Sequence, residues 1–336
     1  MRTRFVAVSL LALALGSASG TVIADDIGQT RAEQAGNALI GTPAPALKLT
    51  TIDGQSIDLS SLYGKKAVYL KFWATWCVPC LQQMPHFEHA YETEGSDLAV
   101  IAINTNFNET PDSVATYRQK HGLKMPIVMD DGRLAAALNL RVTPQHVLIA
   151  RDGRIAYVGH LADDKLDLAI AAMRQPQSRA PKTQQGRVVN AAPPRSVTTS
   201  AGEQFILRDP KGQRDTVLVF MSPWCEGYLK ESRPTMSAQC REVREQTEKL
   251  APESPSRWID IASGLWADAA DLKDYQQKNG LRIPLALDAS GNLFRRYAVN
   301  SVPTVIVLGP DGRELRRASG GATEVAALLS NDARKL

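Results

Sequence analysis

The sequence is poor in cysteine, in aromatic residues and in long apolar runs. Only four of its 336 residues are cysteine, and aromatic residues make up 6%. No cysteine lies near residue 20, which excludes a lipid-modified N-terminal cysteine, and no stretch beyond the N-terminus is apolar enough to cross a bilayer. The net charge of +4 falls to about +2 without Arg2 and Arg4, so nucleic acid is not an expected partner.

The N-terminus resembles a secretory signal peptide in its build. Arg2 and Arg4 precede an apolar stretch over residues 5–15, and the small residues further on fit cleavage after Ala24. The alternative is an uncleaved anchor, because residues 5–24 carry no charge and are numerous enough to span a bilayer. Both alternatives predict a periplasmic location, with membrane attachment only if the segment stays uncleaved.

An internal repeat predicts two homologous domains. Residues 117–130 and 275–288 are identical at seven of fourteen positions. The pair Trp76-Cys77 recurs as Trp224-Cys225, and Pro144 recurs as Pro303. A chain of 336 residues is also long enough to form two separate cores.

Each repeat is expected to be an α/β domain with a central mixed sheet flanked by helices. Apolar runs at residues 67–74 and 98–103 predict buried strands, and the segment from Cys77 to the Gly95 region is expected to be helical. Strands that alternate with helices favour this class of fold. The expected boundaries are a signal peptide at 1–24, an N-terminal lead at 25–39, a first domain at 40–175, a proline-containing linker at 176–195 and a second domain at 196–336.

The segment Cys77-Val78-Pro79-Cys80 follows a predicted strand and opens a helix. Free backbone amides and the positive end of the helix dipole stabilise a thiolate at Cys77, and a thiolate is the nucleophile of disulfide exchange. A structural disulfide or half of a zinc site are the alternatives, but no second closely spaced cysteine pair supplies the other zinc ligands. We therefore predict a redox-active Cys77-Cys80 disulfide, with no metal and no other cofactor.

The run FWATWCVPC over residues 72–80, followed by Met84-Pro85, carries a family resemblance. It resembles the active-site signature of the TlpA/ResA-like exported thioredoxins, and the similarity extends over residues 40–175. The resemblance implies a thioredoxin fold with Cys77 as the attacking cysteine and Cys80 as the resolving one. It also implies that the partners are protein thiols or disulfides and a redox donor or acceptor protein.

The same resemblance implies further residues of the site. Thr143-Pro144 would be the loop with the family's cis-proline, beside Cys77, where the backbone can pair with an extended substrate strand. Trp76 is read as a platform or core residue next to the cysteines. His146 follows two residues after Pro144 and is expected near the site, although a strand residue can also point away.

Two positions depart from the family pattern. Gln83 stands where many members have glutamate, and Lys71 stands where thioredoxins bury an aspartate. An ammonium at Lys71 that points toward the site would favour the thiolate, so we hypothesise a stabilised Cys77 thiolate. The reduction potentials of thioredoxin-like proteins run from about -270 to about -120 mV. The Val78-Pro79 spacer resembles those of the proteins at the reducing end of this range, which favours a reductase.

The second domain has lost the close cysteine pair. Cys225 matches Cys77, but Tyr228 occupies the position of the resolving cysteine, and the simplest alignment matches Cys240 with Cys80 across an insertion. A continuous helix would hold Cys225 and Cys240 about 22 Å apart, whereas a loop that closes at Cys240 allows pairing. Three interpretations stay open: a structural disulfide, a second redox pair that relays electrons to the first, or a peroxide-reactive Cys225 preceded by Ser222.

The competing class of function is a non-catalytic binding or scaffold protein. In that case a fixed Cys225-Cys240 disulfide would hold a second domain whose task is to dock a partner. Insulin reduction separates an oxidoreductase from such a scaffold.

Overall fold

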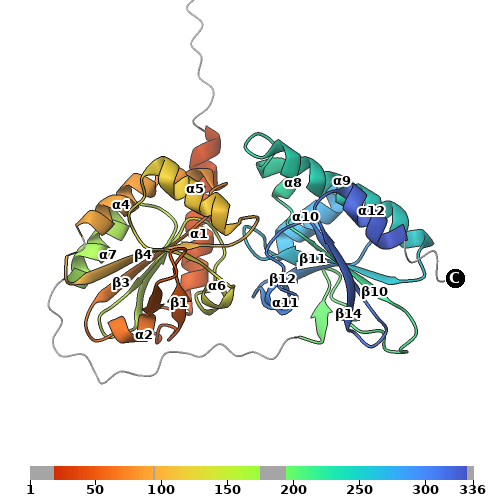
Figure 1. Cartoon of the computed structure of the whole chain (residues 1–336), viewed down its shortest axis with the longest axis horizontal. Helices are drawn as coiled ribbons and strands as arrows, with labels where there is room; N and C mark the ends of the chain where they lie inside the picture. Colours follow the sequence, from red (N-terminus) through yellow and green to blue (C-terminus); the bar gives the residue numbers. More distant parts are fainter. Residues whose placement is uncertain (1–18, 94, 175–193, 331–336) are drawn as a thin grey trace, which may run out of the picture.

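The computed structural model describes residues 19–93, 95–174 and 194–330, which form two α/β lobes (Figure 1). Residues 1–18 of the predicted signal peptide and most of the predicted linker at 176–195 lie outside this part of the chain. Within the described part, no helix is both long enough and apolar enough to span a bilayer.

The first lobe is built on a five-stranded mixed sheet with the strand order β5-β4-β3-β6-β7. Strand β3 lies at its centre, parallel to β4 and antiparallel to β6. These strands are β3 (Ala67–Trp73), β4 (Leu98–Asn104), β5 (Ile127–Met129), β6 (Gln145–Ile149) and β7 (Ile155–Gly159), and a separate hairpin pairs β1 (Lys48–Thr50) with β2 (Ser56–Asp58). All seven residues of β3 are buried, as its apolar run predicted.

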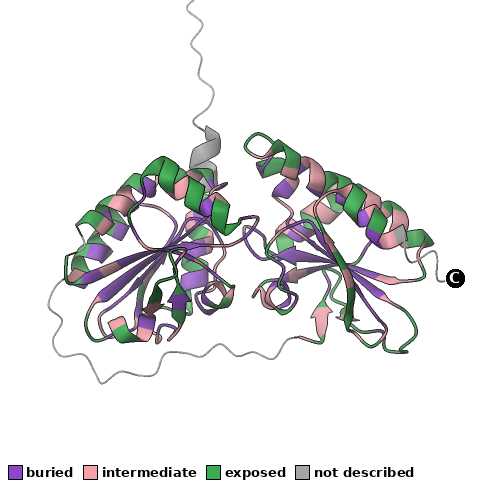
Figure 2. Ribbon diagram, in the orientation of Figure 1, coloured by how far each residue is buried: buried purple, intermediate pink, exposed green. Residues whose placement is uncertain are grey.

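Helices cover both faces of this sheet. Successive side chains of a strand point to opposite faces. Tyr69 therefore packs edge-on against Phe87 of α4 (Met84–Glu92), whereas Val68 lies in one apolar cluster with Leu134 of α6 (Arg133–Ala137). The helices are α1 (Ser19–Asn37), α2 (Leu59–Leu62), α3 (Val78–Gln82), α4 (Met84–Glu92), α5 (Pro111–His121), α6 (Arg133–Ala137) and α7 (Asp164–Arg174). Figure 2 shows the resulting buried strands between exposed outer helix faces.

The helix after Cys77 is divided, which the sequence did not predict. Helix α3 ends at Gln82, and α4 begins at Met84 after the break at Gln83. Pro85 lies in the first turn of α4, where its missing amide hydrogen costs nothing, but the same residue could not continue α3 as a regular helix.

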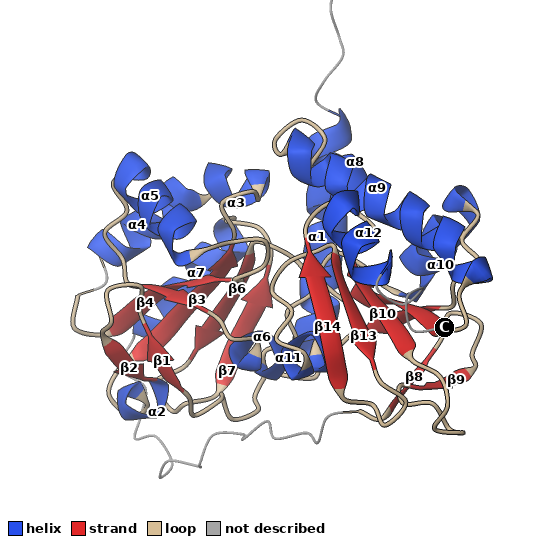
Figure 3. Cartoon of the chain, turned by 45° about the vertical axis from the view of Figure 1, so that its right-hand side comes forward, coloured by secondary structure: helices blue, strands red, loops and turns tan. Residues whose placement is uncertain are grey.

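The second lobe repeats the topology of the first. Its sheet has the order β12-β11-β10-β13-β14, with β10 parallel to β11 and antiparallel to β13. Figure 3 shows the strands β10, β13 and β14 of this sheet side by side. The strands are β10 (Thr216–Met221), β11 (Arg257–Ser263), β12 (Leu285–Asp288), β13 (Thr304–Leu308) and β14 (Glu314–Ser319), after a hairpin of β8 (Ser196–Thr198) and β9 (Gln204–Ile206). The helices are α8 (Cys225–Tyr228), α9 (Pro234–Leu250), α10 (Ala269–Asn279), α11 (Asn292–Arg296) and α12 (Ala322–Ser330), with a 3-10 turn at Ala251–Glu253.

Helix α1 spans the end of the predicted signal peptide and most of the predicted N-terminal lead at 25–39. It packs on β7 and reaches the other lobe (Figure 1). Gly28 lies against the ring of His160, so closely that an added Cβ would come within 2.5 Å of Nε2. Three residues further along the helix, Arg31 donates to Asp271 of α10 at 2.6 Å. The helix therefore connects the two lobes, and its contacts are tertiary rather than local.

Candidate active site

Cys77 and Cys80 form a disulfide where β3 gives way to α3. The sulfur atoms are bonded and the Cα atoms lie 5.2 Å apart. Cys77 is the N-cap of α3, and the Cys80 backbone N–H donates to the Cys77 sulfur at 3.2 Å. A donor at this position stabilises negative charge on the sulfur once the disulfide is reduced. Both cysteines are almost completely buried.

The loop before Cys77 is fixed by a carboxylate that the sequence did not single out. Glu109 accepts hydrogen bonds from the Thr75 backbone N–H and, at 3.0 Å, from the Thr75 hydroxyl. The indole N–H of Trp76 donates to the Phe107 carbonyl at 2.7 Å, so Trp76 is held as well. Glu109 lies 34 positions from Thr75, a separation at which no local motif would have revealed the contact.

Lys71 lies beneath the disulfide, fully buried on β3. Its Nζ donates to the Cys80 carbonyl at 3.4 Å and sits 5.5 Å from the centre of the Phe87 ring. Burial lowers the pKa of Lys71 from 10.5 to about 7, and no ion pair found among the described residues includes this side chain. Lys71 Nζ therefore contacts the backbone of the inner cysteine, and with a pKa of about 7 it is not a permanent cation near neutral pH.

A buried polar chain runs beside Lys71 on the neighbouring strand. His146 pairs with Lys71 across the sheet, accepts the Tyr69 hydroxyl hydrogen at Nδ1 (2.7 Å) and donates from Nε2 to the Gln83 side-chain oxygen (2.8 Å). Burial, followed by the nearby Lys71 charge, lowers the pKa of His146 well below its ordinary value. His146 is thus a neutral imidazole that points toward the site, and Gln83 is its acceptor.

The Thr143–Pro144 peptide bond is cis, in agreement with what the family resemblance implied. His160 Nδ1 donates to the Pro144 carbonyl at 2.6 Å, which fixes this loop from β7. Trp266 of the second lobe donates from its indole nitrogen to the Thr143 hydroxyl at 3.3 Å. The loop is therefore part of the contact between the lobes.

Cys225 and Cys240 also form a disulfide, with Cα atoms 6.3 Å apart. Cys225 begins α8 directly after β10, whereas Cys240 lies in the middle of α9. The chain turns between the two helices, and Pro234 starts α9 instead of interrupting a single long helix. Pro303, which follows a second cis bond, lines a small cavity together with Cys240.

The second lobe contacts the segment that carries the first disulfide. Trp76 and Trp224, which each precede a cysteine, stack with ring centres 5.0 Å apart. The Val78 backbone N–H, directly after Cys77, donates to the Tyr228 hydroxyl at 3.1 Å. The two strand-to-helix junctions that carry Cys77 and Cys225 therefore face each other across the contact between the lobes.

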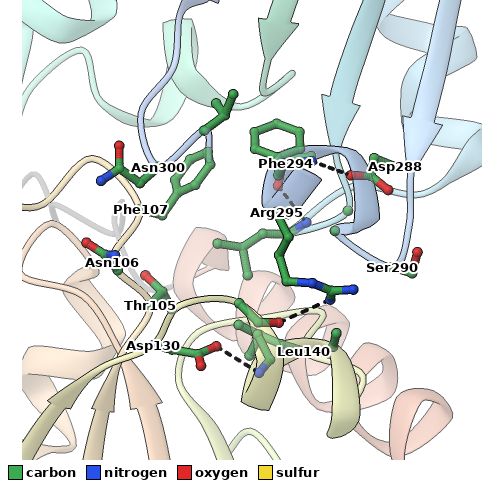
Figure 4. A pocket seen from close by; sticks show the side chains of 18 of the residues that line it. Thr105, Asn106, Phe107, Asp130, Leu140, Asp288, Ser290, Phe294, Arg295 and Asn300 are labelled. Atoms are coloured by element: carbon green, nitrogen blue, oxygen red, sulfur yellow. Dashed lines mark hydrogen bonds between the residues drawn. The ribbon is translucent and has the colours of Figure 1, made fainter. Parts of the chain in front are cut away.

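A cavity of about 340 Å³ lies beside this contact and is lined by equivalent turns of both lobes (Figure 4). Asp130 and Asp288 lie in its wall, but each carboxylate already accepts backbone N–H groups at the start of α6 or α11. Burial raises the pKa of Asp130 to about 6. Neither disulfide lines the cavity, so it belongs to the packing between the lobes rather than to the redox site.

A buried CxxC disulfide at the end of the central strand of a thioredoxin-like sheet defines the thiol-disulfide oxidoreductases as a class. Comparisons with known proteins give the family. The family described as Redoxin matches residues 39–172. The thiol-disulfide oxidoreductase ResA of Bacillus thuringiensis (strain Al Hakam) is 31% identical over 132 residues, which are 38% of this chain and 75% of that protein.

Two further similarities concern the same kind of protein. The thioredoxin-like protein YneN of Bacillus subtilis is 34% identical over 135 residues, covering 38% of this chain and 79% of its own. A thioredoxin-family thiol:disulfide interchange protein of Chlorobium tepidum TLS is 27% identical, covers 40% of this chain and 97% of its own, and has a TM-score of 0.34. The chain belongs to the redoxin family of ResA-like thiol-disulfide oxidoreductases through its first lobe.

Proposed function

We propose that the chain is an exported reductase of protein disulfides in which Cys77 attacks the substrate and Cys80 resolves the mixed disulfide. The observation that carries this proposal is the cap of α3, where the Cys80 N–H donates to the Cys77 sulfur. In the reduced site the Cys77 thiolate attacks one substrate sulfur and the other leaves with the electron pair. Cys80 then attacks the Cys77 sulfur, which re-forms the internal disulfide and releases the second substrate thiol.

Lys71 is the proposed proton acceptor of Cys80. A resolving thiol must lose its proton before it attacks, and the acids that serve this purpose in related sites are replaced by Gln83 and Lys71. With a pKa of about 7, Lys71 is partly a neutral amine under neutral conditions, and its Nζ lies 3.4 Å from the Cys80 carbonyl. The same ammonium, once formed, stabilises the developing thiolate.

The substrate is proposed to approach over an apolar rim. Val78, Leu81 and Tyr228 are large apolar side chains that are 48%, 42% and 44% exposed around the start of α3. Such a rim suits an unfolded or extended protein segment, whose apolar side chains gain from leaving water. Protein thiols and disulfides, exchanged with a separate redox donor, are therefore the proposed partners.

The proposal also includes the direction of electron transfer and the cellular location of the protein. The Val78-Pro79 spacer favours a potential near the reducing end of the thioredoxin range. The signal-peptide-like N-terminus supports export to the periplasm, and an uncleaved segment would keep the protein on the membrane.

Insulin reduction with dithiothreitol as the electron source tests the function. We expect turbidity from insulin chains with the wild type, and loss of at least a hundredfold in rate with Cys77→Ser. Cys225→Ser is the matched control, because it removes the equivalent residue of the second lobe; retained activity would mean that the first lobe acts alone, and loss would mean that both pairs take part. A wild-type protein that reduces no insulin at any ratio of reduced to oxidised dithiothreitol would contradict the proposal. It would favour a non-catalytic binding or scaffold protein.

A further inference from the structure

The surroundings of the second disulfide differ from those expected of a purely structural disulfide, which is called a clamp below. Cys240 lines a cavity of about 20 Å³, which is enough for one water molecule. Asp260, on β11, lines the same cavity and is 4% exposed, and its Oδ1 has no hydrogen-bond partner among the described residues. The buried hydroxyl of Ser222, in the same wall, is also unpaired there. Unpaired buried polar groups cost stability, so a clamp alone gives no reason to keep them.

The charged groups that face Asp260 leave its carboxylate without a counterion. Arg244 of α9 lines the cavity, but its guanidinium is held by both carboxylate oxygens of Glu226, at 2.7 and 3.1 Å. Tyr275 of α10 also faces the cavity and donates its hydroxyl to Glu226 at 2.7 Å. Burial, followed by the negative charge of Glu248 on α9, raises the pKa of Asp260 well above its ordinary value. Burial therefore favours the protonated form of the Asp260 carboxyl.

The position of Asp260 in the sheet mirrors that of Lys71. By the repeat, Val219 of β10 is the equivalent of Lys71, and Val219 pairs directly with Asp260 on the adjacent strand. In the first lobe Lys71, on the central strand, lies next to Cys80. In the second lobe Asp260, on the strand beside the central one, lines the cavity next to Cys240. One group is an amine and the other a carboxyl, but each lies close to the second cysteine of its pair.

The segments that carry the two cysteine pairs are in contact. Trp76 and Trp224 stack directly before Cys77 and Cys225, and Tyr228 contacts the backbone directly after Cys77. Cys225 is fully buried, and the residues just after it in α8 lie against the first lobe.

We propose that Cys225-Cys240 is a second redox-active disulfide that exchanges an electron pair with Cys77-Cys80, with Asp260 as the proton donor and acceptor of Cys240. This inference rests on the proposed function, because it uses the reduced Cys77-Cys80 dithiol as the electron source.

The exchange balances as two sulfur displacements. The Cys77 thiolate attacks the Cys225 sulfur, the Cys77–Cys225 bond forms, and the Cys225–Cys240 bond breaks. Cys240 leaves with the electron pair and takes a proton from Asp260. Cys80 then gives its proton to Lys71 and attacks the Cys77 sulfur, so that the first pair is oxidised, and Cys225 leaves as a thiolate that is protonated from water. Two electrons have moved to the second pair, and the reverse transfer uses the same atoms.

Trapping in the full-length chain tests the exchange directly. The double variant Cys80→Ser with Cys240→Ser keeps only Cys77 and Cys225, and we expect it to form an intramolecular Cys77–Cys225 disulfide on mild oxidation, seen by peptide mass mapping. The matched control, Cys80→Ser with Cys225→Ser, keeps Cys77 and Cys240 and should not form the bridge. Absence of the Cys77–Cys225 bridge would overturn the exchange.

Asp260 is tested separately in a chain that carries Cys77→Ser and Cys80→Ser, where dithiothreitol can reduce only the second disulfide. Asp260→Asn should slow this reduction at least tenfold and flatten its dependence on pH, while the thermal midpoint stays within a few degrees because Asn resembles the protonated acid. Asp209→Asn, which removes a buried carboxylate of the same lobe outside the cavity, should leave the rate unchanged. An unchanged rate in Asp260→Asn would remove Asp260 from the exchange.

The outcomes separate the two proposals. If the wild type fails to reduce insulin but the Cys77–Cys225 bridge forms, the proposed function falls and the exchange stands. If insulin is reduced and the bridge does not form, the second disulfide is a clamp.

Discussion

Replacing Lys71 by methionine should stabilise the protein while slowing its chemistry. Folding removes Lys71 completely from water and lowers its pKa from 10.5 to about 7. At about 1.36 kcal/mol for each pKa unit, keeping the ammonium buried costs up to about 5 kcal/mol. Methionine has a similar length, no charge and a good fit beside the Phe87 ring, so it removes this cost without opening a large cavity.

The sign of the pH dependence follows from proton binding. Between pH 7 and about 10.5 the unfolded chain holds the Lys71 proton and the folded chain has lost it, so the free energy of unfolding rises with pH over this window. The cost is fully present below pH 7 and is gone above about pH 10.5. The stability advantage of Lys71→Met should therefore be largest at pH 6 and shrink steadily toward pH 10.

Urea unfolding of the oxidised wild type and of Lys71→Met at pH 6, 7, 8 and 9 measures this difference. Stopped-flow thiol exchange on the same samples measures the chemistry, and we expect the resolving step of the variant to be at least tenfold slower near neutral pH. A variant that is no more stable than the wild type at pH 6, or whose advantage does not shrink with pH, would refute the charge-burial reasoning. An unchanged exchange rate would refute the role of Lys71 as a proton acceptor.

Three further outcomes are expected. Glu109→Gln should lower the free energy of unfolding by about 1–3 kcal/mol and reduce insulin turnover, because one amide oxygen cannot replace both carboxylate contacts to Thr75; urea unfolding and the insulin assay check this. Cys225→Ser with Cys240→Ser should cost about 3 kcal/mol, the loop entropy of a cross-link that spans 15 positions, and equal stability with and without the cross-link would contradict it. Arg31→Ala should lower the thermal midpoint slightly at low salt and have no effect in 1 M salt, because its ion pairs to the second lobe are partly exposed.

The sheet strands were predictable because their signals are local. The apolar run at 67–74 marks β3, and the repeat at residues 117–130 and 275–288 indicates that the second lobe copies the first. Helix α1 was not predictable, because Gly36 packs on Val158 of β7 and Gly28 on His160, and only these tertiary contacts explain the glycines. The break after Gln82 follows from Pro85, a local signal whose consequence depends on where the next helix starts.

The site was predictable in part for the same reason. The motif located Cys77 and Cys80, and the family resemblance singled out Lys71. The apolar run predicted that Lys71 is buried, but its contact with the Cys80 carbonyl is visible only in the folded chain. Glu109 and Tyr69 act through partners 34 and 77 positions away, so their roles emerge only from the folded chain.

Trapping by Cys80→Ser tests the assignment of the attacking cysteine most directly. Without the resolving thiol, a substrate protein should stay attached to Cys77 as a mixed disulfide that dithiothreitol releases and that mass spectrometry maps to this residue. The reciprocal variant Cys77→Ser should trap nothing. Equal trapping by Cys77→Ser, or attachment of the substrate at Cys225 instead of Cys77, would contradict Cys77 as the nucleophile.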